Sequence, residues 1–375
     1  MEIAALLKLM VQRQGSDLFI TAGRPPCLKL HGVIKAISKH LLTDQEAREI
    51  VFSVMNDKIR REFDATKEAN FAINPAKIGR FRVSAFIQRD QVGMVIRRIE
   101  SQIPTFKDLQ LPPKLREIAM LKRGLVAIVG ATGSGKSSTL AAMVGHRNRH
   151  STSHIISIED PIEFVHEHQQ SIVTQREVGI DTESYEVALK NTLRQAPDVI
   201  LIGEVRTRET MEYAIAFAET GHLVLTTLHA SNAYSALDRI INFFPKDRRD
   251  QLLLDLSLNL RAVIAQDLIQ QTDGKGRVPA VEILINTPLV QDMIRKGDIH
   301  KMRELMRRSG EEGMMTFDQS LFILHQNGLI SYDDALTHAD SANEVRLMIK
   351  LDKENSQLGG RLQDELPSRL LLDDG

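Results

Sequence analysis

Residues 130–138 carry glycines, a lysine and hydroxyls at the spacing of a phosphate-binding loop. The segment fits the pattern G-x-x-x-x-G-K-[ST] and directly follows a short apolar run. Glycines let the backbone curl so that successive N–H groups face an anion, and the start of the following helix adds a positive dipole end. In this pattern the lysine reaches the β- and γ-phosphates of a nucleotide, and the next hydroxyl binds Mg²⁺. The expected nucleotide-binding residues are Gly130, Gly133, Ser134, Gly135, Lys136, Ser137 and Ser138.

Acidic residues follow two further strand-like runs. Residues 158–163 place Glu159, Asp160 and Glu163 just past one run, and residues 199–204 end another run with Glu204. Ligands gather at the carboxyl ends of strands in open α/β sheets. Glu204 therefore stands where a P-loop protein carries its Mg²⁺-side carboxylate, with Glu in place of the commoner Asp. The alternative reading of the first cluster is a solvated acidic turn.

Two histidines, His222 and His229, bracket a third strand-like run at 223–228. A single histidine in such a place is more often structural than catalytic. Their order after the glycine-rich loop and the two acidic strand ends favours a functional reading.

Strands that alternate with helices must position these residues. Apolar runs typical of buried parallel strands lie at 125–129, 154–158, 199–202 and 223–226, with helical patterns at 185–193 and 210–218 between them. Alternation of this kind indicates βαβ units with right-handed crossovers. Farther on, the pattern predicts one long amphipathic helix over 248–270 and a tight turn between strands at 273–276.

The first hundred residues read as a smaller α+β module. Strand-like runs lie at 17–20, 27–30, 80–86 and 92–96, and Thr43 with Glu46 has the spacing of a helix capping box. Prolines at 104, 112 and 113 indicate a boundary. The expected organisation is an N-terminal domain over 1–100, a linker over 101–120, an α/β nucleotide-binding domain with C-terminal helices over 121–350 and a flexible tail over 351–375.

Composition limits the remaining classes. The 375 residues hold 48 basic and 49 acidic side chains, for a net charge of −1, which disfavours a dedicated nucleic-acid binder. The single cysteine, Cys27, excludes a disulfide framework and a multi-cysteine zinc site within the chain. No run of eighteen apolar residues predicts a membrane span, and Lys8 interrupts the apolar start that a secretory signal would need. The expected compartment is therefore the cytoplasm.

With these motifs in this order, the sequence resembles the secretion-superfamily ATPases, and more narrowly the type IV pilus retraction ATPases of the PilT/PilU family. The segments that carry the resemblance are 15–18, 22–26, 80–83, 130–137, 159–164, 201–204 and 219–229. The resemblance implies a RecA-like P-loop ATPase domain beside a PAS-like N-terminal domain. It also implies a hexameric ring that couples Mg²⁺-dependent ATP hydrolysis to domain rotation, pilus retraction and twitching motility.

The resemblance also assigns roles by position. It implies that Glu163 positions the attacking water, that Glu204 is the Mg²⁺-side carboxylate and that His229 lies near the γ-phosphate. Arg82 and Arg97 match arginines that reach the phosphates of the nucleotide when the ring closes. Surface salt bridges are the alternative reading of these two arginines, and Arg80, Arg89 and Arg98 are rival candidates.

Two departures suit the PilU branch of the family: the segment 293–297 reads Met-Ile-Arg-Lys-Gly, and a leucine-rich charged tail covers 357–375. This branch implies an accessory role beside a PilT-type motor, with an inner-membrane pilus platform protein as partner and a peripheral place at the base of the pilus machine. Three alternatives are an assembly or secretion motor, an ATP-binding adaptor ring and a DNA translocase. Cys27 alone cannot supply the tetracysteine zinc module usual in the first, and the charge balance disfavours the last.

Overall fold

The computed structural model describes residues 2–30, 32–99, 102–308, 310 and 313–352. Its contacts divide the chain into two units, one made of 1–103 with 156–192 and the other of 104–155 with 193–375. The domain limits expected from the sequence remain predictions. The tail expected over 351–375 lies outside the described residues from 353 onward.

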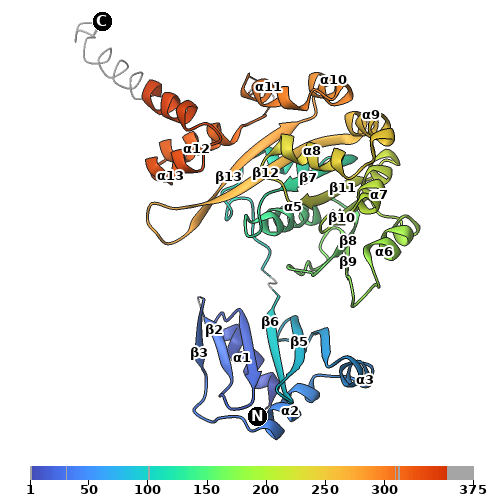
Figure 1. The fold of residues 1–375 in the computed structure, drawn as a ribbon, viewed down its shortest axis with the longest axis vertical. Coiled ribbons are helices and arrows are strands. Elements are labelled where there is room, and N and C mark those ends of the chain that lie inside the picture. The colour runs from blue at the N-terminus through green and yellow to red at the C-terminus, as the bar shows by residue number, and fades with distance from the viewer. Residues whose placement is uncertain (1, 31, 100–101, 309, 311–312, 353–375) are drawn as a thin grey trace, which may run out of the picture. The chain divides into compact units, whose positions relative to one another are not determined.

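The first unit contains a six-stranded sheet in the order β3-β2-β1-β6-β5-β4, with antiparallel pairing throughout (Figure 1). Its strands are β1 (Asp17–Thr21), β2 (Cys27–Leu30), β3 (Val33–Ala36), β4 (Glu68–Ile73), β5 (Phe81–Gln88) and β6 (Gln91–Arg98). Three helices, α1 (Ile3–Gln12), α2 (Asp44–Ser53) and α3 (Asp57–Thr66), share one core with this sheet. The alternation typical of a sheet with one packed face is plain in β5, where buried residues alternate with half-buried ones from Phe81 to Phe86. Leu18, Ile96 and Val83 are paired across three strands and are buried in the core.

Helix α2 begins as its sequence predicts. The hydroxyl of Thr43 accepts the N–H of Glu46, and the Glu46 carboxylate accepts the N–H of Thr43 at 2.8 Å. The capping box satisfies two backbone donors that have no partner within the helix.

The second sheet has seven strands in the order β13-β12-β7-β11-β10-β8-β9. They are β7 (Gly124–Val129), β8 (His154–Glu159), β9 (Ile172–Glu177), β10 (Val199–Ile202), β11 (Leu223–Leu228), β12 (Leu260–Gln270) and β13 (Arg277–Ile285). The pairs β10–β11, β11–β7 and β7–β12 are parallel, and β12–β13 is an antiparallel hairpin. Every residue of β7, β10 and β11 is buried, as their apolar runs predict.

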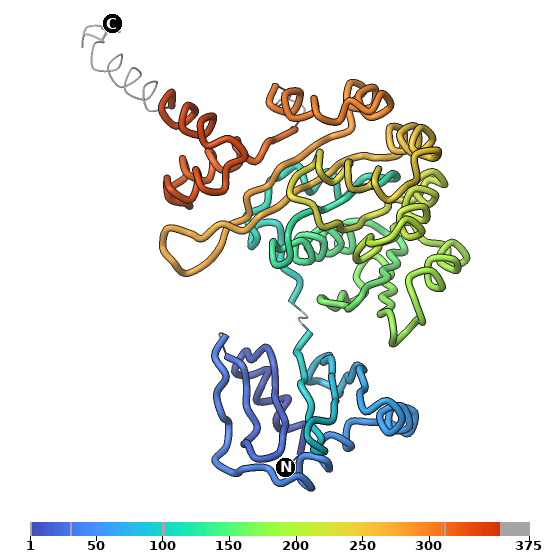
Figure 2. The backbone as a smooth tube through the Cα atoms, in the orientation of Figure 1, coloured from blue at the N-terminus to red at the C-terminus, as the bar shows by residue number. Residues whose placement is uncertain are grey.

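Helices connect these strands on both faces (Figures 1 and 2). The connecting helices are α5 (Lys136–His150), α6 (Tyr185–Thr192), α7 (Arg208–Glu219), α8 (Ala233–Asn242) and α9 (Arg249–Asn259). Helix α4 (Lys114–Ala119) precedes β7, and the helices that follow β13 are α10 (Pro288–Lys296), α11 (Met302–Arg308), α12 (Phe317–Gln326), α13 (Tyr332–Thr337) and a helix over 342–352. In the strand order, β8 lies on the β9 side of β7, whereas β11 lies on the β13 side of β10. The connection from β7 to β8 therefore crosses the sheet in one direction, and the connection from β10 to β11 crosses it in the other. Right-handed crossovers therefore place α5 and α7 on opposite faces. The expected α/β class with a smaller α+β module is confirmed.

The long helix expected over 248–270 is wrong in its second half. Helix α9 ends at Asn259, and residues 260–270 form β12, which pairs with β7 on one side and β13 on the other. The run Ala262–Ala265 is apolar and fully buried. A short apolar run fits either element by periodicity, and here the pairing with two neighbouring strands decides. The turn expected at 273–276 is confirmed, since it joins β12 to β13 with Gly274 at a φ of 67°.

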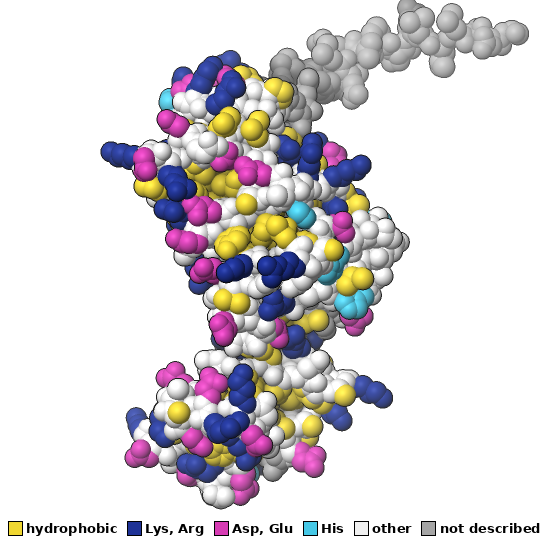
Figure 3. Space-filling view, turned by 90° about the vertical axis from the view of Figure 1, so that its right-hand side faces the viewer, with side chains coloured by type: hydrophobic (Ala, Val, Ile, Leu, Met, Phe, Trp, Pro, Cys, Tyr) yellow, Lys and Arg dark blue, Asp and Glu magenta, His cyan; other side chains and the backbone are white. Residues whose placement is uncertain are grey.

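None of the described helices combines the length and the apolarity that crossing a membrane requires. Basic and acidic side chains are interspersed on the face shown in Figure 3, in keeping with the balanced net charge.

Candidate nucleotide-binding site

The glycine-rich loop lies between β7 and α5, as its sequence predicts. Gly135 caps the helix with a φ of 88°, a region that favours glycine because other residues meet steric strain there. The Lys136 ammonium donates to the main-chain oxygens of Gly130, at 2.9 Å, and Ala131, at 2.8 Å. The lysine thus lies over the start of the loop, and residues 131–133 beside it are exposed.

The loop has the properties of an anion site. The hydroxyl of Ser134 is buried and has no hydrogen-bond partner in the described part of the chain. Ser137 and Ser138 are half-buried in the first turn of α5, where the helix presents its free N–H groups and its positive dipole end. These residues fit the phosphates of a nucleotide.

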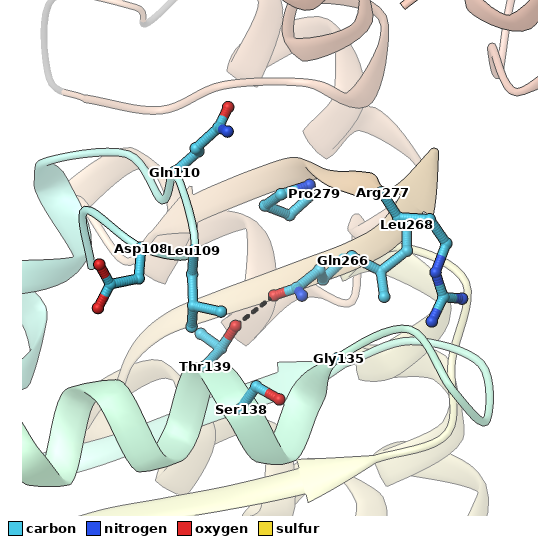
Figure 4. Close-up of a pocket in the computed structure, with 10 residues that line it drawn as sticks. All are labelled: Asp108, Leu109, Gln110, Gly135, Ser138, Thr139, Gln266, Leu268, Arg277 and Pro279. Atoms are coloured by element: carbon cyan, nitrogen blue, oxygen red, sulfur yellow. Dashed lines mark hydrogen bonds between the residues drawn. The ribbon is translucent and has the colours of Figure 1, made fainter. Parts of the chain in front are cut away.

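A pocket of about 280 Å³ opens beside this end of α5. Gly135, Ser138 and Thr139 line one side, and Leu268 and Pro279 of the β12–β13 hairpin line another (Figure 4). Its volume is close to the ~300 Å³ at which ligand pockets begin. A mixed polar and apolar wall next to a phosphate loop suits the nucleoside part of a nucleotide.

Glu204 and His229 meet in the structure. The Nε2 atom of His229 lies 3.0 Å from one carboxylate oxygen of Glu204, and Arg206 lies 2.8 Å from the other. Glu204 is largely buried, with 17% of its side chain exposed, whereas Arg206 is 61% exposed. The carboxylate is therefore fixed from two sides and still reachable.

Strand register explains this meeting. Leu228 of β11 pairs with Val129 of β7, and Ile202 of β10 pairs with Thr226. The three parallel strands consequently end at one edge of the sheet, where the phosphate loop, His229 and Glu204 follow them. The hydroxyl of Thr227 donates to the Gly203 oxygen at 2.6 Å, which holds the segment before Glu204 against β11.

His222 lies at the other edge. It precedes β11, and its Nδ1 atom lies 3.1 Å from the Thr220 hydroxyl. Its main-chain oxygen accepts the N–H of Gly124, the first residue of β7. The structure therefore brings His229 to the candidate site and His222 to the opposite end of the strand.

The first acidic cluster follows β8 and belongs to the first unit. The Glu159 carboxylate accepts the Ser157 hydroxyl at 2.6 Å and the Gln175 amide at 3.1 Å, and burial raises its pKa above the ordinary value. Glu163 is exposed. The water-positioning role expected of Glu163 remains a prediction.

The two arginines expected to contact phosphates lie side by side on the N-terminal sheet. Arg82 of β5 pairs in register with Arg97 of β6, and Arg97 pairs with Asp17 of β1. The Nε atom of Arg97 lies 2.8 Å from the buried Asp17 carboxylate, while 70% of the arginine side chain is exposed. The rival Arg80 lies 3.7 Å from Glu177 and is mostly buried, as befits a structural ion pair.

Sequence reasoning missed three partners of these residues. Arg206 follows Glu204 by only two positions, so their contact could have been predicted from the sequence. Asp17 belongs to the resemblance segment 15–18, but nothing in the sequence pairs it with Arg97. Gln266, which contacts the phosphate loop, falls in the segment expected to be helical.

Known proteins are similar to this chain in sequence and in fold. The family model described as "Type II/IV secretion system protein" matches residues 64–310. The type IV pilus ATPase PilU of Pseudomonas aeruginosa is 62% identical over 95% of this chain and 93% of its own. The type IV pilus retraction ATPase PilT of the same organism is 40% identical over 89% of this chain and 97% of its own. A crystal structure of the pilus retraction motor PilT with bound ADP superposes with a TM-score of 0.86, at 38% identity, over 92% of this chain and 98% of that one.

Proposed function

The chain belongs to the type II/IV secretion system protein family and, within it, to the PilT/PilU ATPases of the type IV pilus, and we propose from this how its residues work. It is a nucleotide-binding ATPase of pilus retraction and twitching motility. We propose that hydrolysis depends on Mg²⁺ and that the working form is a homohexameric ring.

In this proposal the phosphate loop and the edge of the sheet share one triphosphate. Backbone N–H groups of the loop bind the phosphates, and Lys136 exchanges its two loop carbonyls for phosphate oxygens. Ser137 and Glu204 supply the oxygens that would hold Mg²⁺, which neutralises charge on the phosphates. His229, fixed by Glu204, senses the γ-phosphate side, and Glu163 orients the attacking water.

Arg82 and Arg97 complete the proposed machinery. Phosphoryl transfer depends on positioning and on neutralising charge rather than on covalent chemistry. Two adjacent arginines, one of them anchored by Asp17 and exposed, suit contact with the phosphates when neighbouring subunits close. ATP bridging two modules would favour the closed arrangement more than ADP does, and that difference in affinity can shift the equilibrium.

The cellular location and the partners that we propose rest on the similarity of this chain to PilU and PilT. We propose that the ring works in the cytoplasm as an accessory to a PilT-type motor, held peripherally at the inner membrane by the pilus platform protein. No nucleic acid takes part in this proposal.

The meeting of Glu204 and His229 at the edge where the phosphate loop begins is the observation that carries the proposal. The test is steady-state hydrolysis of ATP by the full chain with Lys136→Ala and Glu204→Ala, and Lys190→Ala as an exposed lysine control on α6. We expect at least a hundredfold loss of kcat in the first two variants and none in the control. Wild-type turnover in Lys136→Ala would refute the proposed site.

The cellular role is tested by deleting the gene. Loss of twitching with surface pili retained supports retraction, whereas loss of the pili themselves would instead indicate an assembly motor.

A further inference from the structure

Gln266 joins the second sheet to the phosphate loop. It lies on β12 and is buried, with 4% of its surface exposed. Its Nε2 atom donates to the main-chain oxygen of Ser134 at 2.8 Å, and its Oε1 atom accepts the Thr139 hydroxyl at 2.7 Å, the bond drawn in Figure 4. Both partners belong to the phosphate-binding segment, one in the loop and one in the first turns of α5.

The orientation of this carboxamide is fixed by chemistry. A carbonyl oxygen only accepts hydrogen bonds, so the group that faces Ser134 must be the NH₂ of Gln266. The remaining amide oxygen then accepts from Thr139. A carboxylate at position 266 could not donate to Ser134, and an apolar side chain could bind neither partner.

The glycines of the motif fit closely against the same residue. A Cβ atom on Gly135 would lie 2.7 Å from Nε2 of Gln266, and one on Gly130 would collide with the main-chain oxygen of Gln266. The neighbouring residue Ala265 pairs with Val129, the last residue of β7, which brings Gln266 beside the start of the loop. The loop therefore packs directly on Gln266 at both of its ends.

A bond to the Ser134 carbonyl determines where a neighbouring N–H points. In a trans peptide the C=O and the following N–H lie in one plane and point in opposite directions. With the Ser134 oxygen held toward β12, the N–H of Gly135 is turned away from β12. That N–H is one of the donors that the motif presents to phosphate.

We propose that Gln266 is a positioning residue for the phosphate loop, which holds the Ser134–Gly135 peptide in its anion-binding orientation. The inference rests on the proposed function only for the identity of the anion, the phosphates of a nucleotide. ATP and ADP share the phosphates that the loop N–H groups contact. The loss of Gln266 should therefore weaken both nucleotides alike and raise KM while kcat changes little.

The test compares ADP binding by calorimetry, KM and kcat for ATP, and thermal unfolding of the full chain. Gln266→Met keeps the length of the side chain and removes both hydrogen bonds. We expect ADP affinity to fall and KM to rise by roughly tenfold, as for one to two net hydrogen bonds, with kcat within about twofold. Unchanged ADP affinity, or a lower melting temperature without a change in affinity, would overturn the proposal.

A matched pair of variants at Thr139, whose hydroxyl donates to Gln266, keeps the test decisive if Gln266→Met does not fold. Thr139→Val removes the hydroxyl and leaves a side chain of nearly the same shape, whereas Thr139→Ser keeps the hydroxyl. We expect roughly threefold weaker ADP binding in the first and wild-type binding in the second. Equal binding by the two variants would refute the role.

The ADP arm separates this inference from the proposed catalysis. Weaker ADP binding in Gln266→Met, in a chain whose wild type does not hydrolyse ATP, would support the positioning role and defeat the catalytic proposal. Normal hydrolysis with unaltered ADP binding in the variant would do the reverse.

Discussion

Glu282 is a buried carboxyl group whose titration should control the stability of the chain near neutral pH. It lies on β13 with 4% of its surface exposed, and its carboxylate accepts the N–H of Ala233, the first residue of α8, at 2.7 Å. Burial and the nearby charge of Asp340 raise its pKa from 4.5 to about 7, against the lowering effects of the Ala233 hydrogen bond and of Arg303. The substitution Glu282→Gln removes this titration and keeps a carbonyl acceptor for Ala233.

The sign and size of the effect follow from the pKa. Between pH 4.5 and about 7 the folded chain keeps a proton that the unfolded chain releases, so the stability from this group is full below pH 4.5 and is lost as pH rises to about 7. Each tenfold change in a protonation equilibrium is worth about 1.4 kcal/mol, so the loss across the window approaches about 3 kcal/mol. Relative to wild type, Glu282→Gln should gain up to this amount of unfolding free energy by pH 8.

The assay is urea denaturation of both proteins at pH 4.5, 6, 7 and 8. The difference between the two proteins isolates Glu282, because the other carboxyl groups with raised pKa, among them Glu177 and Asp318, titrate in both. Glu186→Gln, an exposed change on α6, is the matched control and should leave the pH dependence unchanged. A difference between wild type and Glu282→Gln that stays constant over this range would refute the reasoning.

Other perturbations test the site itself. Arg97→Ala should lower kcat by 10³-fold or more if this arginine contacts phosphates in the transition state, with ADP affinity retained; equal kcat values in steady-state assays would make it a surface ion pair. Chelation of divalent cations by EDTA should abolish hydrolysis and added Mg²⁺ should restore it, whereas turnover that persists in EDTA would exclude the metal role of Ser137 and Glu204. Gly135→Ala should destabilise the chain by about 1 kcal/mol or more and weaken ADP binding, because the residue has a positive φ and faces Gln266; calorimetry that finds normal binding would contradict this.

Short-range patterns in the sequence predict much of the fold and of the candidate site. The loop at 130–137 and the carboxylate of Glu204 are readable because one segment of chain carries both the strand and the residues that follow its end. The strands that flank the loop were predictable for the same reason, since their apolar runs are short, complete and buried. Conversely, the helix expected over 248–270 is wrong at β12, because only the pairing of this segment with β7 and β13 distinguishes it from a buried helix.

Contacts between segments that lie far apart in the sequence cannot be predicted from sequence patterns. Gln266 and Ser134 lie 132 residues apart, and Asp17 and Arg97 lie 80 apart. Neither pair has a fixed spacing from which it could be recognised. The sequence predicts only that His229 and Glu204 lie at the same edge of the sheet. It does not predict their contact, because a contact depends on side-chain orientation, which strand order does not specify.

The two bonds from Lys136 to its own loop have a consequence for turnover. In the proposed site the Lys136 ammonium exchanges the Gly130 and Ala131 oxygens for phosphate oxygens. The affinity of the loop would then reflect a competition and not the full attraction between the charges. The same competition works in reverse after hydrolysis. When a product dissociates, the Lys136 ammonium can return to the oxygens of the loop. This return lowers the free-energy cost of product release, which suits an ATPase that must release nucleotide in every cycle.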